Sequence, residues 1–161
     1  MSNNQSDEFR KIFGHFPTGI TVIGMNNNGQ FSGITANSVT SVSLDPMLLL
    51  VCIAKKAASH DKLKSAGNFS VNFLSNKQKD VSQFFASSSN TENPMGDFKY
   101  KLGNNQSPIL SDVIAWVECN IIDWFPGGDH SIVIGEVSNM KIENVSHQPL
   151  IYYNGQYGEL A

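Results

Sequence analysis

The sequence predicts a mainly β fold, an antiparallel barrel with a few short peripheral α-helices. Apolar segments of strand length recur along the chain, turn-forming residues separate them, and no internal repeat is present. Six or more such segments with local connections are the pattern of antiparallel strands that close into a barrel. The chain has 161 residues, 40% of them hydrophobic, so we expect a single domain over residues 1–161.

A helix is predicted before the first strand. Ser6 suits the N-cap position, Asp7 and Glu8 follow in the first turn, and Pro17 ends the helix. Its apolar residues recur at helical spacing and form one face: Phe9, Ile12, Phe13 and Phe16.

Three strands are predicted next, at residues 18–25, 30–43 and 47–54. The first two form a hairpin around Asn26-Asn27-Asn28-Gly29, because Asn and Gly tolerate a positive φ. Asp45-Pro46 forms a corner before the third. Residues 47–54 are continuously apolar, which indicates a strand covered on both faces.

The middle of the chain predicts two short helices around a strand. The first helix covers residues 59–66, with Ser59 as N-cap and Gly67 as C-cap. A strand at residues 69–74 and a helix at residues 77–86 follow.

The last third contains a long loop and two hairpins. Residues 87–108 have no clear element, and their scattered aromatic side chains indicate a partly docked lid. Strands at 113–125 and 132–142 are joined by Pro126-Gly127-Gly128-Asp129, a strong turn signal. A terminal hairpin pairs residues 150–153 with 156–160.

Composition excludes several function classes. The formal net charge is −3 without a dense basic patch, which argues against nucleic acid or an anionic membrane as the main partner. The longest apolar run, residues 47–54, is too short to span a bilayer. The polar N-terminus lacks the apolar region of a signal peptide, so we expect a cytoplasmic protein.

The cysteines and histidines predict no metal site. Cys52 and Cys119 match no metal or redox spacing and lie in apolar surroundings, so buried thiols are expected. No pair of histidines has the spacing of metal ligands.

Residues 33–46 form a strand-like run crowded with neutral hydrogen-bonding side chains. In an extended chain, Thr35, Asn37 and Ser41 share one face, and no charged side chain precedes Asp45 in the run. Two interpretations stay open. The hydroxyls bond neighbouring backbone, as most side-chain hydrogen-bonding groups do, or they form the wall of a site for a polar, largely uncharged ligand.

The segment Ala54-Lys55-Lys56-Ala57-Ala58-Ser59-His60 places two lysines and a serine at the predicted start of a helix. Free backbone N–H groups, the helix dipole and a hydroxyl favour an anion such as phosphate there. The alternative is a solvated basic corner with no ligand.

Gly127-Gly128-Asp129-His130 is the third chemical feature, a histidine that leaves a glycine turn and enters a strand. Either His130 orients a ligand beside the turn, or it only bonds Asp129 and caps the hairpin.

These residues together resemble the flavin reductase family of the FMN-binding split-barrel fold, nearly end to end. The matching motifs are Phe16-Pro17-Thr18-Gly19-Ile20-Thr21-Val22, residues 33–46, Val71-Asn72-Phe73-Leu74, Phe85-Ala86, Gly128-Asp129-His130, Gly135-Glu136-Val137 and Pro149-Leu150-Ile151-Tyr152-Tyr153. The resemblance implies a homodimer of six-stranded antiparallel split β-barrels, of Greek-key type. It also implies a bound flavin, FMN or FAD, that oxidises NADH or NADPH and often supplies reduced flavin to a separate monooxygenase.

The resemblance also implies the site residues. The flavin ring would be lined by Thr35, Ala36, Asn37 and Ser38, with Ser41 nearby. Its edge would meet Cys52, Ile53, Ala54 and Lys55, while Ser59 approaches the phosphate and Phe85 and Ala86 close the pocket. Asp129 and His130 would face the nicotinamide, where His130 orients the ring by hydrogen bonding.

Three departures from the family pattern affect specificity. Met47 follows Asp45-Pro46 where many members have a second proline, Ala58-Ser59-His60 replaces a hydroxyl-x-hydroxyl arrangement, and Asp97-Phe98 replaces Arg-Phe. The choices between FMN and FAD and between NADH and NADPH stay open. Two other functions stay open as well: a flavin-binding sensor or storage module without turnover, and a flavin-dependent reductase of ferric iron or another acceptor.

Overall fold

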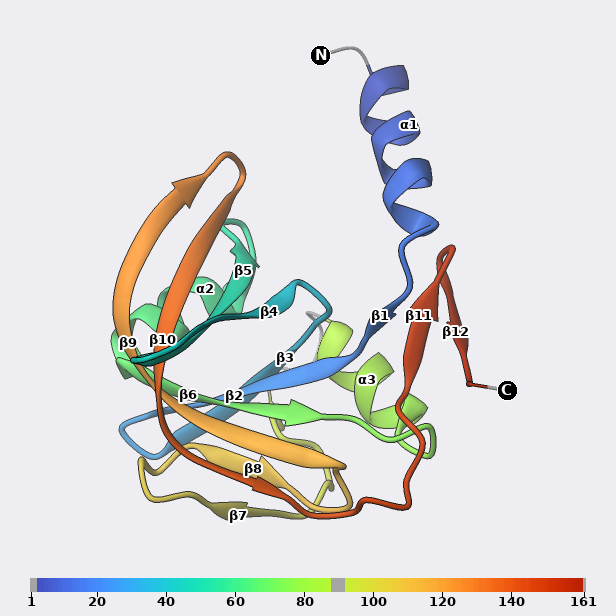
Figure 1. Ribbon diagram of the computed structural model, residues 1–161. Helices are drawn as coiled ribbons and strands as arrows, with labels where there is room; N and C mark the ends of the chain where they lie inside the picture. The colour runs from blue at the N-terminus through green and yellow to red at the C-terminus, as the bar shows by residue number, and fades with distance from the viewer. Residues whose placement is uncertain (1–2, 88–91, 161) are drawn as a thin grey trace.

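A computed structural model describes residues 3–87 and 92–160 and has a mainly β architecture with three helices among these residues (Figure 1). The elements in chain order are α1 Asn3–Gly14, β1 Thr18–Gly19, β2 Thr21–Asn27, β3 Gln30–Ala36, β4 Val39–Leu44, β5 Met47–Ala54, α2 Ala58–Ala66, β6 Asn68–Phe73, α3 Lys79–Ala86, β7 Tyr100–Leu102, β8 Pro108–Leu110, β9 Ala115–Gly127, β10 His130–Ile142, β11 Ile151–Tyr153 and β12 Gln156–Gly158. The expected mainly β class with few helices is confirmed.

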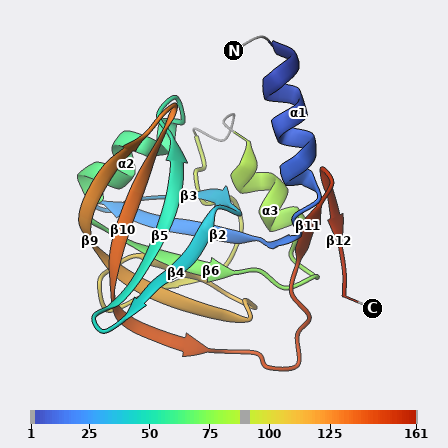
Figure 2. The same ribbon diagram turned by 45° about the horizontal axis from the view of Figure 1, so that its top comes forward.

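The main sheet is antiparallel and curls on itself, as Figures 1 and 2 show. It has seven strands in the order β3-β2-β6-β9-β10-β5-β4 among the described residues, so the expected count of six is not confirmed. The extra strand arises because the predicted strand at 30–43 is broken at Asn37 and Ser38. Its two halves, β3 and β4, are the two edges of the sheet, and the break brings the chain from one edge to the other.

Two apolar cores lie on opposite faces of β2. Ile23 and Met25 point into a core inside the curled sheet, together with residues such as Val51, Phe69 and Val133. Val22, which precedes Ile23 and points to the opposite face of the strand, packs into a second core beneath α3. β2 is therefore buried on both faces along most of its length.

β5 was expected to be buried on both faces, but only one of its faces is fully buried. Leu49, Val51 and Ile53 are buried, but the alternate residues Leu48, Leu50, Cys52 and Ala54 are only half-buried. The outer face of this apolar strand is thus partly uncovered within one chain.

Helix α1 also exposes its apolar face. The helix stands away from the rest of the molecule in both views (Figures 1 and 2), and its Phe9 and Phe13 are 62% and 59% exposed. It ends at Gly14, so Phe16 and the expected end at Pro17 lie beyond it. It begins at Asn3, before the expected N-cap Ser6.

Several predicted boundaries need correction. The N-cap of α2 is Ala57, and Ser59 lies inside the helix, whereas the expected C-cap Gly67 is confirmed by its left-handed φ of 72°. The predicted loop at 87–108 contains β7 and begins β8 at Pro108, while residues 88–91 of that loop lie outside the described part. The long hairpin of β9 and β10 extends farther into its turn than expected, to Gly127 and His130.

Candidate functional site

The polar run at 33–46 spans the end of β3, the break and β4. The Thr35 hydroxyl donates to the carbonyl of Ser82 on α3 at 2.6 Å, and the Ser38 hydroxyl donates to the carbonyl of Cys52 at 3.2 Å. These two hydroxyls therefore donate to backbone carbonyls, as the first of the two interpretations expects. Asn37 lies exposed at the break, where its amide donates to Thr18 Oγ1 at 3.2 Å. Ser41 is exposed on β4.

The strands bring this run beside the other predicted residues. Val39 of β4 pairs with Val51 of β5, and Ala54 of β5 pairs with His130 of β10. Because directly opposed residues share a face, Ala54 and His130 lie on the same outer surface. Ile53, in contrast, points into the core with 1% exposure, so only its backbone is available to a ligand.

Ala36 shows the same limitation as Ile53. Its side chain is buried with 8% exposure and belongs to the inner core. Its carbonyl accepts a hydrogen bond from the Thr21 hydroxyl at 2.7 Å, so the end of β3 is firmly held.

Lys55 fastens the turn that carries His130. Its backbone N–H donates to the Asp129 carbonyl at 2.9 Å, and its Nζ donates to the Gly128 carbonyl at 2.7 Å. The Lys55 ammonium therefore links the end of β5 to the turn before β10.

His130 contacts Asp129, as the simpler of the two interpretations expected. Its Nδ1 lies 2.8 Å from Asp129 Oδ1, and this hydrogen bond holds the pKa of the Asp129 carboxyl below its usual value. The His130 side chain is 43% exposed, so the carboxylate orients a ring that a ligand can still reach.

A hollow of about 160 Å³ lies at the start of α2, and it contains two hydroxyls without partners. Ser59 Oγ and Ser32 Oγ are buried and have no hydrogen-bond partner within the described part of the chain. Both line this hollow, as does Lys62, one turn after Ser59 on α2. Two unpartnered hydroxyls, a helix N-terminus and an ammonium together form a site for an anion.

The sequence reasoning missed Ser32 and Lys62. Lys62 had a detectable signal, its position three residues after Ser59 on the same helix face. Ser32 had none, because its role depends on how β3 packs against α2.

Phe85 forms the apolar side of the same hollow, with Ala86 beside it. A side-chain carbon at Gly33 would lie 2.8 Å from the Phe85 ring, so β3 approaches this ring only because residue 33 is glycine. Phe84 and Phe98 pack against Phe85 with ring centroids 5.1 and 5.9 Å away.

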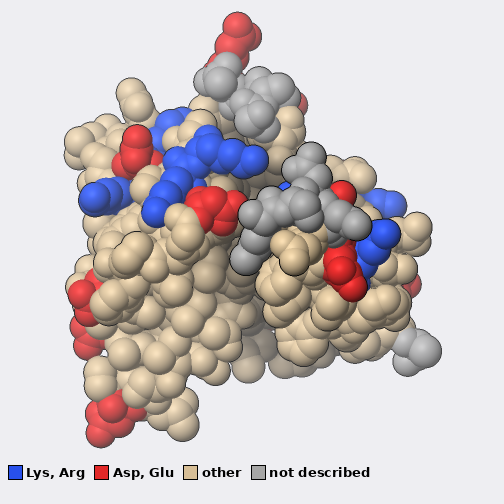
Figure 3. Space-filling view, turned by 90° about the horizontal axis from the view of Figure 1, so that it is seen from above, with Lys and Arg blue, Asp and Glu red and all other residues tan. Residues whose placement is uncertain are grey.

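Seen from above, basic side chains gather on the side of the molecule that holds α2 and the β9–β10 turn, next to a deep depression (Figure 3). Lys62 is the charged residue among the described residues that line the hollow at Ser59, and its ammonium favours an anionic ligand there.

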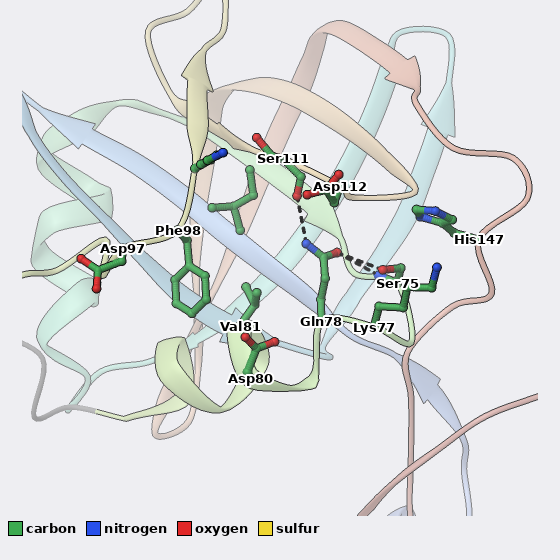
Figure 4. A pocket seen from close by; sticks show the side chains of 12 residues that line it. Ser75, Lys77, Gln78, Asp80, Val81, Asp97, Phe98, Ser111, Asp112 and His147 are labelled. Carbon is green, nitrogen blue, oxygen red and sulfur yellow. Dashed lines mark hydrogen bonds between the residues drawn. The ribbon is translucent and has the colours of Figure 1, made fainter.

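A separate hollow of about 480 Å³ lies beside α3, and none of the predicted site residues lines it (Figure 4). Its rim carries both signs of charge, with Lys77 and Lys99 near Asp80, Asp97 and Asp112. Asp97, one of the departures from the family pattern, therefore lines this hollow and not the one at Ser59.

The described residues contain no group of three or more His, Cys, Asp or Glu side chains placed to hold a metal ion. Burial raises the pKa of the Cys119 thiol to about 12, with a smaller contribution from Glu118, and burial also raises the pKa of Cys52. Both thiols are therefore protonated near neutral pH and are poor nucleophiles. Among the helices of the described part, none has the length and apolarity needed to cross a membrane.

Comparison with known proteins identifies the family. A family model described as the flavin reductase like domain matches residues 13–161. The chain belongs to the flavin reductase family. This flavin reductase domain is 46% identical over 149 residues to a protein named "Probable flavin reductase" of Rhizobium meliloti, covering 92% of this chain and 47% of that protein. The chain thus spans about half the length of that relative.

A second relative is nearly the same length as this flavin reductase domain. A flavin reductase of Pseudomonas putida is 38% identical over 154 residues, which cover 95% of this chain and 89% of that protein. Among solved structures, a nitrilotriacetate monooxygenase component B homolog from Mycobacterium thermoresistibile superposes with a TM-score of 0.94 at 30% identity. That match covers 100% of this chain and 89% of the other.

Proposed function

We propose that this protein is a flavin reductase that uses NADH or NADPH to reduce FMN or FAD. The observation that carries the proposal is the hollow in which the Ser32 and Ser59 hydroxyls lie unpartnered between Lys62 and Phe85. A flavin offers the two kinds of group that suit this hollow. Its phosphate satisfies the hydroxyls and the cation, and its apolar chain and ring edge pack on Phe85.

Bound flavin supplies a ring that accepts a hydride at N5 from C4 of the nicotinamide. The protein's own residues bind and orient the two rings and exclude water. Residues 35–38 and 52–55 form the wall beside the ring, with Ser41 at its margin. The curled seven-stranded sheet, as this chain's form of the split barrel, brings these two segments together, and the Cys52 N–H donates to the Ser38 carbonyl at 3.1 Å.

His130 is proposed to orient the nicotinamide. Asp129 holds its Nδ1, which leaves a partly exposed ring at the edge of β10 and directly opposite Ala54. A fixed imidazole at this point donates or accepts one hydrogen bond from the carboxamide, and no proton transfer from His130 is required for hydride transfer.

We propose a monooxygenase as the partner that consumes the reduced flavin. The Mycobacterium structure is by its name one component of a monooxygenase, which supports a two-component arrangement for this chain. Two unpaired cysteines and a nicotinamide cosubstrate fit a cytoplasmic location.

We also propose that the protein acts as a homodimer. The half-buried outer face of β5 and the exposed Phe125 of β9 lie on the same face of the sheet, with β10 between the two strands, and α1 exposes its own apolar face. A second copy of the chain that covers both surfaces accounts for an apolar strand and an amphipathic helix that lack intramolecular cover.

The test of the function follows NADH or NADPH oxidation by absorbance after addition of FMN, FAD or riboflavin, with oxygen uptake measured in parallel. We expect steady oxidation that depends on flavin. Tight flavin binding without nucleotide oxidation would support the sensor or storage module instead. Oxidation that requires ferric iron would support the acceptor reductase, and no oxidation with any flavin would overturn the proposal.

A further inference from the structure

A second hollow continues the flavin-phosphate hollow along α2 and β3. The two share Ser32, Lys62 and Pro94, and the second has a volume of about 460 Å³. Its volume lies in the range of about 300–1,000 Å³ that small-molecule pockets occupy. A ligand whose phosphate lies at Ser59 therefore has further space beyond Lys62.

The walls of both hollows run in the same order. From the first hollow to the second, α2 contributes Ser59 and then Lys62, while β3 contributes Gly33, Ser32 and then Phe31. One groove thus passes from the phosphate site to the tip of the β2–β3 hairpin.

The far part of this groove offers an aromatic and amide lining. Phe31 of β3 and Tyr100 of β7 are neighbours with ring centroids 5.5 Å apart, and both line the hollow. Amides of Asn27, Gln30 and Asn93 also line it, and no acidic side chain is among the described lining residues. Aromatic faces stack on a nucleobase, and amides hydrogen-bond its edges or a ribose.

The groove is held in shape before any ligand binds. At the hairpin tip, Asn28 and Gly29 adopt positive φ angles of 53° and 87°, and Asn26 Oδ1 accepts the Gly29 N–H at 2.7 Å. The Ser65 hydroxyl of α2 donates to Asn27 Oδ1 at 3.3 Å, which joins the hairpin to the helix. A preformed groove costs little ordering free energy on binding.

We propose that this groove, between α2, β3 and β7, binds the AMP half of FAD, so that FAD is the preferred flavin of this protein. The proposal rests on the function proposed above. Lys62 lies at the junction of the two hollows, where the diphosphate of FAD must pass, and Tyr100 provides the surface for the adenine. The adenosine of NADH has the same chemistry, but only FAD joins adenosine covalently to the phosphate at Ser59.

The first experiment measures the Kd of riboflavin, FMN and FAD for the purified protein by quenching of flavin fluorescence. We expect the Kd of FAD to be about tenfold lower than that of FMN, since a stacked base contributes a factor of this order. AMP should compete with FAD and leave riboflavin binding unchanged. Equal Kd values for FMN and FAD, or AMP that competes with NADH but not with FAD, would overturn the proposal.

The second experiment separates the two parts of the groove with variants. Tyr100→Ala should lower the FMN-to-FAD ratio of Kd values about fivefold or more, whereas Leu102→Ala, at an exposed position on the same strand, should not change it. Lys62→Ala should weaken FMN and FAD relative to riboflavin, and Lys64→Ala on the same helix is the matched control. An unchanged ratio in a folded Tyr100→Ala protein contradicts the proposal.

The same purified proteins distinguish the AMP-groove proposal from the reductase function proposed above. NADH oxidation with saturating FMN tests the reductase function and does not depend on the AMP groove. If that activity is present while FAD shows no advantage, only the groove assignment fails. If no flavin supports oxidation, the reductase function fails as well. A Tyr100→Ala protein that does not fold leaves the AMP competition on the unaltered chain to decide the outcome.

Discussion

Gly33 shows how a single missing side chain shapes the site. It belongs to the polar run that first indicated a ligand wall, but its neighbours in space come from α3 and β2. A Cβ atom there would lie 2.8 Å from a Phe85 ring carbon and 3.0 Å from Val22 Cγ1. The close approach of β3 to α3 sets the width of the hollow at Ser59.

Gly33→Ala is therefore expected to displace the Phe85 ring and distort the flavin hollow. We expect the Kd of FMN to rise about tenfold, and the melting temperature to fall, because overpacking costs about 1–3 kcal/mol. Fluorescence titration and thermal melting measure the two effects. Gly19→Ala is the control, since a Cβ there meets nothing within 4 Å. Equal flavin affinity in both variants would contradict this account.

His130 carries a prediction about the nicotinamide. Removal of the imidazole in His130→Ala should raise the KM for NADH about tenfold, because one positioned hydrogen bond contributes about 1 kcal/mol or somewhat more. The Kd of flavin should change less than threefold, because His130 is not proposed to contact the flavin. Steady-state kinetics and flavin titration give the two values. His147→Ala, at the separate hollow beside α3, is the matched control. Equal losses of both affinities would indicate that His130 only holds the hairpin.

At the scale of elements, most strands and turns followed from the sequence, whereas the break in the polar run and the short strand β7 did not. Alternation and turn residues predicted the β2–β3 hairpin and the long β9–β10 hairpin, because both signals are local. The run at 33–46 has no glycine or proline at Asn37 and Ser38, so nothing local marked the break. The break is stabilised by a bond between distant residues, in which the Cys52 N–H donates to the Ser38 carbonyl at 3.1 Å.

Glu143 joins three elements at the far end of the sheet. Its carboxylate accepts hydrogen bonds from Lys141 of β10, Trp116 of β9 and Lys101 of β7, and these hydrogen bonds lower its pKa from 4.5 to about 2. A carboxyl whose pKa is lower in the folded state stabilises the fold above pH 4.5. This stabilisation is lost as the pH falls from about 4.5 towards 2.

Glu143→Gln should therefore lower the melting temperature at pH 7 by a few degrees, and the difference from the unaltered protein should vanish near pH 2. Thermal melting at a series of pH values measures it. Glu136→Gln, at an exposed position of β10, is the control and should show a small difference that does not depend on pH in this way. A constant difference between pH 7 and pH 2 would contradict the role of the charged carboxylate.

At the scale of the whole molecule, the chain exposes apolar surfaces that a single copy does not cover. The outer face of β5 and Phe125 of β9 lie on one face of the sheet, and the apolar face of α1 forms another surface. The N-terminal helix was predicted from the spacing of its apolar residues, and it is present as α1, but these residues do not pack into the core of the same chain.

Phe13→Asp should convert the proposed dimer into monomers, since a charge cannot be buried in an apolar interface without a partner. Sedimentation velocity measures the mass before and after the change. Lys11→Asp reverses a charge elsewhere on the same helix and is expected to leave the dimer intact. A monomer in the unaltered protein, or a stable dimer in Phe13→Asp, would refute the role of α1.

The amino-acid sequence by itself determined the local features of this protein: where most strands and helices lie, which faces are apolar, and which motifs mark the flavin reductase family. These features depend on residue periodicity and turn chemistry within short segments. The anion hollow and its extension depend on packing instead, because Ser32, Lys62 and Tyr100 come from β3, α2 and β7 and meet only when the sheet curls. No local pattern records such a meeting, since its cause is the burial of two cores shared by distant strands.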